Sequence, residues 1–101
     1  MKLETNLKVL KLGIAMDSFF GKKQIEFIQD AKIASDKYTL KQEYLRSIYS
    51  GYLDIRGMAR ALAEELTVEE FQELNEYIQL RHEEARIGVE AEYKLLCLRN
   101  R

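Results

Sequence analysis

The chain has 101 residues, of which 47% are hydrophobic and 33% are charged, and its net charge is −1. This composition excludes a disordered chain, and the balanced charge gives no electrostatic reason to expect nucleic acid or an anionic membrane as a partner. The lack of proline and the presence of only five glycines exclude a turn-rich β domain, so we expect a single all-α domain spanning residues 1–101.

The first third of the chain predicts two short helices. An apolar face recurs at steps of 4, 3 and 4 over a helix at residues 2–17, and a second apolar strip accompanies it, so we expect this helix to contact neighbours on two sides. The first face is Leu3, Leu7, Leu10 and Ile14, and the second strip is Val9, Leu12 and Met16. The phase breaks at residues 17–21, which predicts a new helix over residues 22–35 with Ile25, Ile28 and Ala31 facing inward.

A long helical hairpin is predicted for the rest of the chain. The capping box of Thr39 and Gln42 starts a helix over 40–66, whose apolar phase continues through Gly51 and Gly57. Its apolar residues are Leu45, Ile48, Tyr52, Ile55, Ala59, Leu62 and Leu66. A second capping box, Thr67 with Glu70, starts the helix over 68–98 after a tight reversal. The alternative is one continuous helix over 40–98.

The inner face of the helix over 68–98 has a regular helical spacing. It comprises Phe71, Leu74, Ile78, His82, Ala85, Val89, Tyr93 and Leu96. The pattern therefore predicts a small bundle of about four helices, dominated by the antiparallel two-helix hairpin of 40–66 and 68–98.

The outer face of the last helix carries a second apolar stripe. It consists of Leu80, Ile87, Ala91 and Leu98, flanked by Tyr77 and Leu95. A helix that is apolar nearly all round is normally buried. Either the N-terminal helices wrap the hairpin, or another chain covers the stripe. Because a chain of this size has little material to wrap a helix of roughly 45 Å, we expect these residues to bind a protein partner, most simply a second copy in a two-fold homodimer.

One acidic motif provides an alternative function. Glu69-Glu70-Phe71-Gln72-Glu73 resembles the Glu-Glu-x-x-Glu pattern with which all-α nucleotide pyrophosphatases of the MazG and dUTPase type hold Mg²⁺. Those families also need a downstream Glu-x-x-Asp, and no aspartate follows Asp54. We therefore expect no metal or cofactor, and keep Mg²⁺ binding by Glu69, Glu70 and Glu73 as the alternative.

The remaining candidate residues predict no catalytic site. His82 is the only histidine and falls on the inner face, so we expect it to pack rather than act as a base or ligand. Cys97 is the only cysteine, which favours a reducing cytoplasm, and no segment approaches the roughly 18 apolar residues of a membrane span.

The sequence thus predicts a non-enzymatic interaction module, such as a small adaptor, an antitoxin-like inhibitor, or a regulatory or chaperone-like protein of bacterial or phage type. A further alternative is a nucleic-acid-associated regulator, because residues 1–50 carry nine Lys and Arg against six Asp and Glu. Binding of nucleic acid through residues 68–73 is not expected, since that helix start is acidic.

Overall fold

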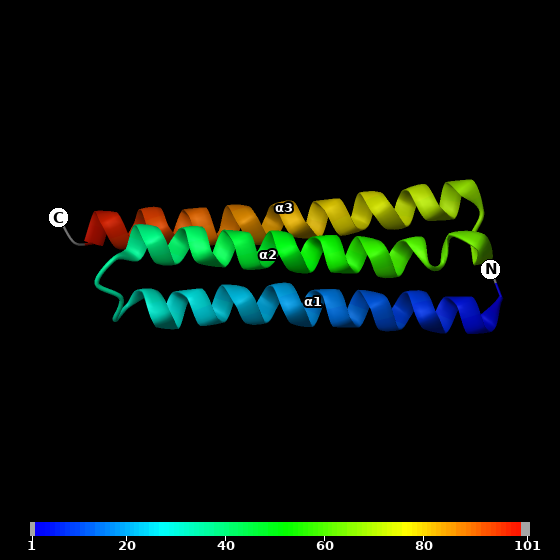
Figure 1. The fold of residues 1–101 in the computed structure, drawn as a ribbon, viewed down its shortest axis with the longest axis horizontal. Helices are drawn as coiled ribbons and strands as arrows, with labels where there is room; N and C mark the ends of the chain where they lie inside the picture. The colour runs from blue at the N-terminus through cyan, green and yellow to red at the C-terminus, as the bar shows by residue number, and fades with distance from the viewer. Residues whose placement is uncertain (1, 100–101) are drawn as a thin grey trace.

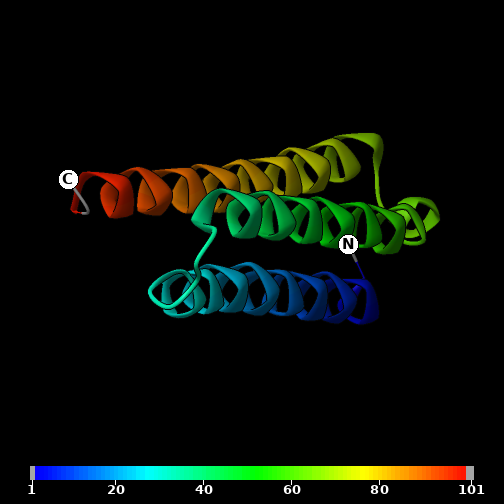
Figure 2. The same ribbon diagram turned by 60° about the vertical axis from the view of Figure 1, so that its left-hand side comes forward.

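The computed structural model describes residues 2–99, which form three α-helices lying side by side along their whole length (Figure 1). They are α1 (Leu3–Ala31), α2 (Lys37–Arg60) and α3 (Val68–Arg99), and a short 3-10 helix, η1 (Ala63–Glu65), precedes α3. The bundle is elongated, with principal extents of 54 × 18 × 17 Å. α1 and α3 run in one direction and α2 runs in the other (Figure 2). The all-α class is confirmed, whereas the expected number of about four helices is wrong.

The two helices predicted over 2–17 and 22–35 form the single helix α1. The expected break at residues 17–21 interrupts only the apolar face that points to solvent. The buried strip continues through it, with Leu12, Met16, Phe20, Phe27 and Ala31 spaced by 4, 4, 7 and 4 residues. One helix follows, because the side chains that pack on the neighbouring helices keep their phase.

The start of α2 corrects a predicted cap. Asp36 is the N-cap, and its carboxylate accepts the backbone N–H of Thr39 at 3.0 Å and the Thr39 hydroxyl at 2.7 Å. Gln42 instead donates to the hydroxyl of Tyr38 at 2.9 Å. These backbone and side-chain hydrogen bonds from Thr39 hold the pKa of Asp36 below its usual value. The helix therefore begins at Lys37, three residues before the predicted start.

The end of α2 differs from the prediction in backbone but not in packing. The predicted helix over 40–66 stops at Arg60, and the chain passes through η1 before α3 begins. Leu62 is nevertheless buried and Leu66 half-buried. The apolar positions that predicted a longer helix therefore pack on the core from the turn.

The reversal before α3 is confirmed, which excludes the continuous helix over 40–98. The backbone N–H of Thr67 donates to Glu70 Oε1 at 2.8 Å, and the backbone N–H of Glu70 donates to Thr67 Oγ1 at 3.1 Å. This reciprocal pair is the predicted capping box, and it satisfies two N–H groups that the first turn of α3 leaves free. Within residues 2–99, no helix carries an apolar stretch long enough to cross a bilayer.

The core is a single seam between the three helices. Its buried side chains come from all of them: Leu12, Met16, Phe20, Phe27 and Ala31 of α1, Ile48, Ile55 and Ala59 of α2, Leu62 of the turn, and Ile78, Ala85 and Val89 of α3. The predicted inner faces of the two hairpin helices are confirmed, because each of their residues is buried or half-buried.

One buried charge lies within this packing. The ammonium of Lys41 lies 5.0 Å from the ring centroid of Tyr38 and 4.6 Å from that of Tyr93, and 3.6 Å from the carboxylate of Glu90. The rings and the carboxylate together compensate for the water that the lysine loses on burial. This contact joins α2 to the C-terminal half of α3.

Candidate interaction surface

The stripe predicted on the outer side of α3 is exposed along its whole length. Tyr77, Leu80, Ile87, Ala91, Leu95 and Leu98 all face solvent, with 56% of Ile87 and 57% of Leu98 accessible. α1 does not cover them, so the N-terminal part of the chain does not wrap the hairpin as one alternative required. Large apolar side chains gathered on one side of an exposed helix mark an interaction site more often than isolated ones do.

A second exposed stripe lies on α1, where the sequence predicted a packing face. Ile14 is 61% accessible and Ile25, which was expected to point inward, is 58% accessible. The stripe consists of Leu3, Leu7, Leu10, Ile14 and Ile25. The strip with Val9, Leu12 and Met16 is the one that packs on the core. The helical spacing is therefore confirmed, but only one of the two strips that were expected to pack against neighbours does so.

The α1 stripe points away from α2. Phe19 packs against Gly51 of α2, and Asp30 accepts a hydrogen bond from Tyr44 of α2 at 2.5 Å. Ile14 and Ile25 each lie five residues before one of these contact residues, which is about 140° around a helix. The stripe is thus on the far side of α1 from α2.

The α3 stripe points away from α2 by the same geometry. The ring of His82 stacks on Tyr52 at 4.2 Å between centroids, and Tyr93 packs against Tyr38. Ile87 and Leu98 each lie five residues after one of these contact residues, again about 140° around the helix.

Both stripes therefore lie on one side of the bundle, the side formed by α1 and α3. Between them runs a shallow hollow of about 350 Å³ lined by Gly21, Gln24, Ile25, Ile28, Gly88 and Glu92, with Phe27 and Val89 beneath. We refer to the eleven stripe residues (Leu3, Leu7, Leu10, Ile14, Ile25, Tyr77, Leu80, Ile87, Ala91, Leu95 and Leu98) as the α1/α3 face.

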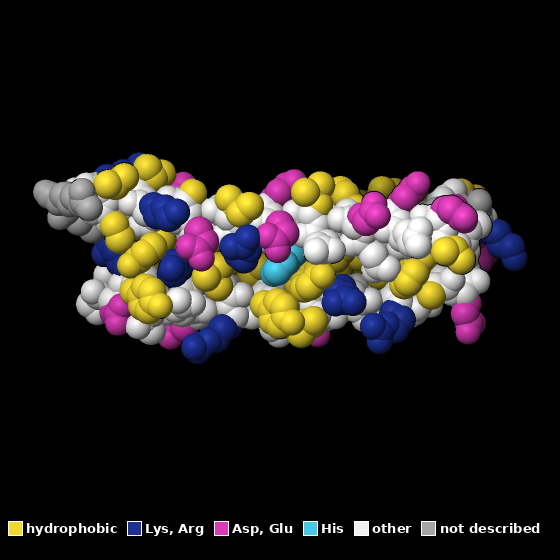
Figure 3. Space-filling model, turned by 90° about the horizontal axis from the view of Figure 1, so that it is seen from above, with side chains coloured by type: hydrophobic (Ala, Val, Ile, Leu, Met, Phe, Trp, Pro, Cys, Tyr) yellow, Lys and Arg dark blue, Asp and Glu magenta, His cyan; other side chains and the backbone are white. Residues whose placement is uncertain are grey.

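Charged side chains flank this face with opposite signs. Lys11 and Lys22 are exposed along the edge of α1, whereas acidic side chains gather over the N-terminal half of α3, where Glu76 and Glu83 lie (Figure 3). Glu83 also accepts from Arg86 at 2.7 Å, and this hydrogen bond lowers the pKa of its carboxyl group. The face is thus an apolar surface with a basic edge on α1 and an acidic edge on the N-terminal half of α3, and Arg86 and Lys94 follow on the C-terminal half of α3.

The glutamates of the alternative magnesium site do not converge. Glu70 is engaged in the capping box, and the backbone hydrogen bond from Thr67 lowers the pKa of its carboxyl group. Glu69 and Glu73 are exposed on the first turns of α3. Among residues 2–99, no group of three His, Cys, Asp or Glu side chains is arranged to hold a metal ion.

His82 lies among aromatic rings rather than acid–base partners. Tyr52 stacks on it, and Phe20 and Tyr49 approach at 6.3 and 6.0 Å between ring centroids. It is 9% accessible, and part of its side chain reaches the surface seen from above (Figure 3). Burial lowers the pKa of His82, which favours the neutral ring. The expected packing role matches these surroundings.

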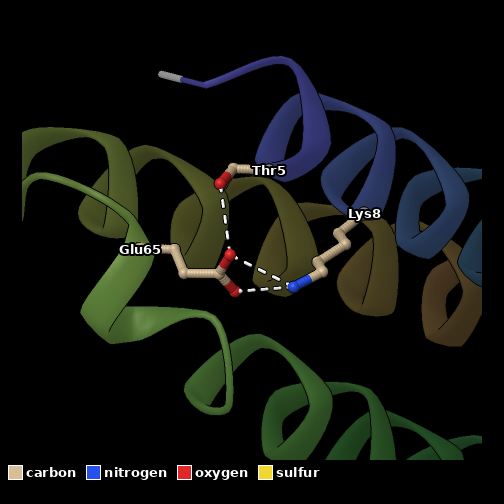
Figure 4. Close-up of polar contacts among 3 residues, drawn as sticks. All are labelled: Thr5, Lys8 and Glu65. Carbon is tan, nitrogen blue, oxygen red and sulfur yellow. Dashed lines mark hydrogen bonds and ion pairs between the residues drawn. The ribbon is translucent and has the colours of Figure 1, made fainter.

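A polar cluster that the sequence did not predict ties η1 to α1. The buried hydroxyl of Thr5 donates to Glu65 at 3.3 Å, and the ammonium of Lys8 lies 3.1 Å from both oxygens of the same carboxylate (Figure 4). Residues 60 positions apart are joined here, so helical periodicity could not reveal the contact. The cluster orients the turn that leads into α3.

Comparisons of this chain with protein-family models, with curated proteins and with solved structures found no match.

Proposed function

We propose that the chain is a non-enzymatic protein-interaction module that binds protein through the α1/α3 face. The observation that carries the proposal is the pairing of two exposed apolar stripes on adjacent helices. At solvent-facing positions, Leu and Ile add little to the stability of a helix. Lys, Glu or Gln at the same positions would have a helix propensity close to that of Leu and higher than that of Ile. A row of Leu and Ile at these positions instead suits a surface that is covered when a partner binds.

The shape of the face supports a helical or helix-lined partner. Two parallel helices with a shallow groove between them offer ridges into which the side chains of another helix can pack. The apolar centre and charged edges follow the usual arrangement of a protein interface, in which the rim is polar. An adaptor, an inhibitor or a small regulatory protein works by this kind of contact.

Photo-cross-linking in the native host tests the proposal. A photoreactive amino acid is placed at Ile14 or Ile87 on the α1/α3 face, and at Leu53 as the control. Leu53 is an exposed apolar residue of α2, away from the face. We expect irradiation to link the chain to protein from positions 14 and 87 far more than from position 53. Equal or absent cross-linking at all three positions would contradict the proposal.

A further inference from the structure

We infer that the occupant of the α1/α3 face is a second copy of this chain, related by a two-fold axis parallel to the helices, so that α1 of each copy lies on α3 of the other. This inference rests on the proposed function of the face. It is argued from the register of the two stripes, the charges at their edges and the size of the surface.

α1 and α3 lie side by side with a constant difference in residue number between neighbouring positions. Arg81 donates to Asp17 at 2.9 Å, and these residues are 64 positions apart. Gln24 and Gly88, which line the same hollow, have the same separation. Because α1 and α3 run in the same direction, each residue of α1 lies beside the residue of α3 numbered 64 higher.

This offset brings the middle of the two stripes to matching levels. Ile14 is level with the segment from Tyr77 to Leu80, and Ile25 is level with the segment from Ile87 to Ala91. Between them, both stripes are polar: residues 17 and 18 on α1 are level with the segment 81–84 on α3. A two-fold axis parallel to the helices keeps these levels, so Ile14 and Ile25 meet apolar segments of the partner's α3. Leu3, Leu7 and Leu10 instead come level with residues 67–74, where the exposed side of α3 is acidic.

The charged edges are complementary in the same arrangement. The axis carries the basic edge of α1 across to the acidic edge of the other copy's α3. Lys11 then comes level with Glu76 of the partner subunit, and Lys22 comes level with position 86, about one helical turn beyond Glu83 of the partner subunit. Within the chain, Lys22 lies 4.0 Å from Glu26 and Glu83 pairs with Arg86, so the Lys11–Glu76 pair carries the charge argument.

The other two-fold arrangement of the faces is electrostatically worse. It would lay α1 on α1 and α3 on α3 in antiparallel fashion, which brings basic edge to basic edge and acidic edge to acidic edge. Like charges across an interface disfavour binding. The edge charges therefore select the arrangement with α1 on α3.

The face is large enough for a stable dimer. α1 has 29 residues, which makes it about 43 Å long at a rise of about 1.5 Å per residue. Two helices packed about 10 Å apart give a face about 20 Å wide, hence about 850 Å², close to the roughly 800 Å² per partner of a standard interface.

Sedimentation velocity of the full chain from micromolar to millimolar concentration provides the test. We expect the wild-type chain to sediment as a species whose mass is twice that of one chain. Ile25→Lys and Ile87→Lys should each weaken the dimer at least about tenfold, since each places an unpaired charge in the apolar interface. Leu53→Lys, an equivalent change on α2, should leave it unchanged. Circular dichroism establishes that each variant is folded.

Charge reversal tests the arrangement of the helices. Lys11→Glu and Glu76→Lys should each weaken the dimer about fivefold, because each pair occurs twice and turns from attraction to repulsion. Mixing the two variants should restore the wild-type affinity. Reversals without effect on the dimer would overturn the arrangement.

The remaining outcomes separate this inference from the proposed function. A chain that stays monomeric, yet cross-links to a different protein from positions 14 and 87, overturns the two-fold dimer and leaves the interaction function standing. A monomer that cross-links to nothing overturns both. A dimer that Ile25→Lys and Ile87→Lys do not weaken uses another surface, and overturns the inference as well.

Discussion

The ring of Phe19 lies directly against the α-carbon of Gly51, so closely that a β-carbon at position 51 would overlap two ring atoms and crowd a third. Gly51 thus allows α1 and α2 to approach where Phe19 packs. The helix itself does not require a glycine there, because its backbone conformation is ordinary.

Gly51→Ala is therefore expected to destabilise the fold by about 1–3 kcal/mol, the usual cost of overpacking. Gly57→Ala is the matched control on the same helix, since a β-carbon at position 57 has no neighbour within 4 Å. It should stabilise the fold by about 0.5–1 kcal/mol through helix propensity. Urea denaturation of both variants measures the difference, and equal effects would contradict the proposed Phe19–Gly51 packing.

The helix caps give a second prediction. Thr67→Ala removes the hydroxyl that accepts the backbone N–H of Glu70, and should lower the free energy of unfolding by about 0.5–2 kcal/mol. Asp36→Ala should also destabilise, through loss of the Thr39 bonds. Gln42→Ala should be nearly neutral. A loss for Gln42→Ala as large as for Asp36→Ala would restore the cap predicted from the sequence.

The buried imidazole predicts how stability depends on pH. The pKa of His82 lies below the ordinary value of about 6.5 for histidine, because burial disfavours the charged ring, and the nearby carboxylate of Glu83 opposes this shift. The unfolded chain therefore binds the proton more readily than the folded one does. The free energy of unfolding should fall as the pH drops below about 6.5, and should be insensitive to this group above it.

His82→Phe keeps an aromatic ring against Tyr52, Tyr49 and Phe20 but cannot be protonated. Urea denaturation from pH 7.5 to pH 5.5 should show a smaller loss of stability in this variant than in the wild type. If the free energy of unfolding changed equally with pH in the variant and the wild type, His82 would have the same pKa in the folded and unfolded chain. The comparison uses the change with pH, so a difference in overall stability does not affect it.

The sequence predicted the buried strips of α2 and α3, because each strip keeps its helical phase from end to end, although α3 carries a second stripe on its outer side. α1 has two strips, and periodicity alone cannot decide which is buried. The buried one contains Phe20 and Phe27, whose large apolar area provides more of the driving force than the opposing Leu and Ile residues do. Weighting the strips by side-chain size would have found the right side, and the single helix with it.

The candidate surface was half predicted for the same reason. The α3 stripe was recognised because a full inner face already accounted for the core side of that helix. Both strips of α1 were expected to pack against neighbouring elements, so the joint face was not predicted. Contacts such as Thr5 with Glu65 were also missed, since they join residues that only the folded chain brings together.

Cysteine cross-linking between copies tests the central claim most directly. Cys97, the only cysteine, is first replaced in Cys97→Ser, and chains carrying Ile25→Cys are mixed with differently tagged chains carrying Ile87→Cys. We predict that mild oxidation forms the mixed 25–87 disulfide in preference to either symmetric one. A mixed product no more abundant than that of Ile25→Cys with a Leu53→Cys control would contradict the packing of α1 on α3 between two copies.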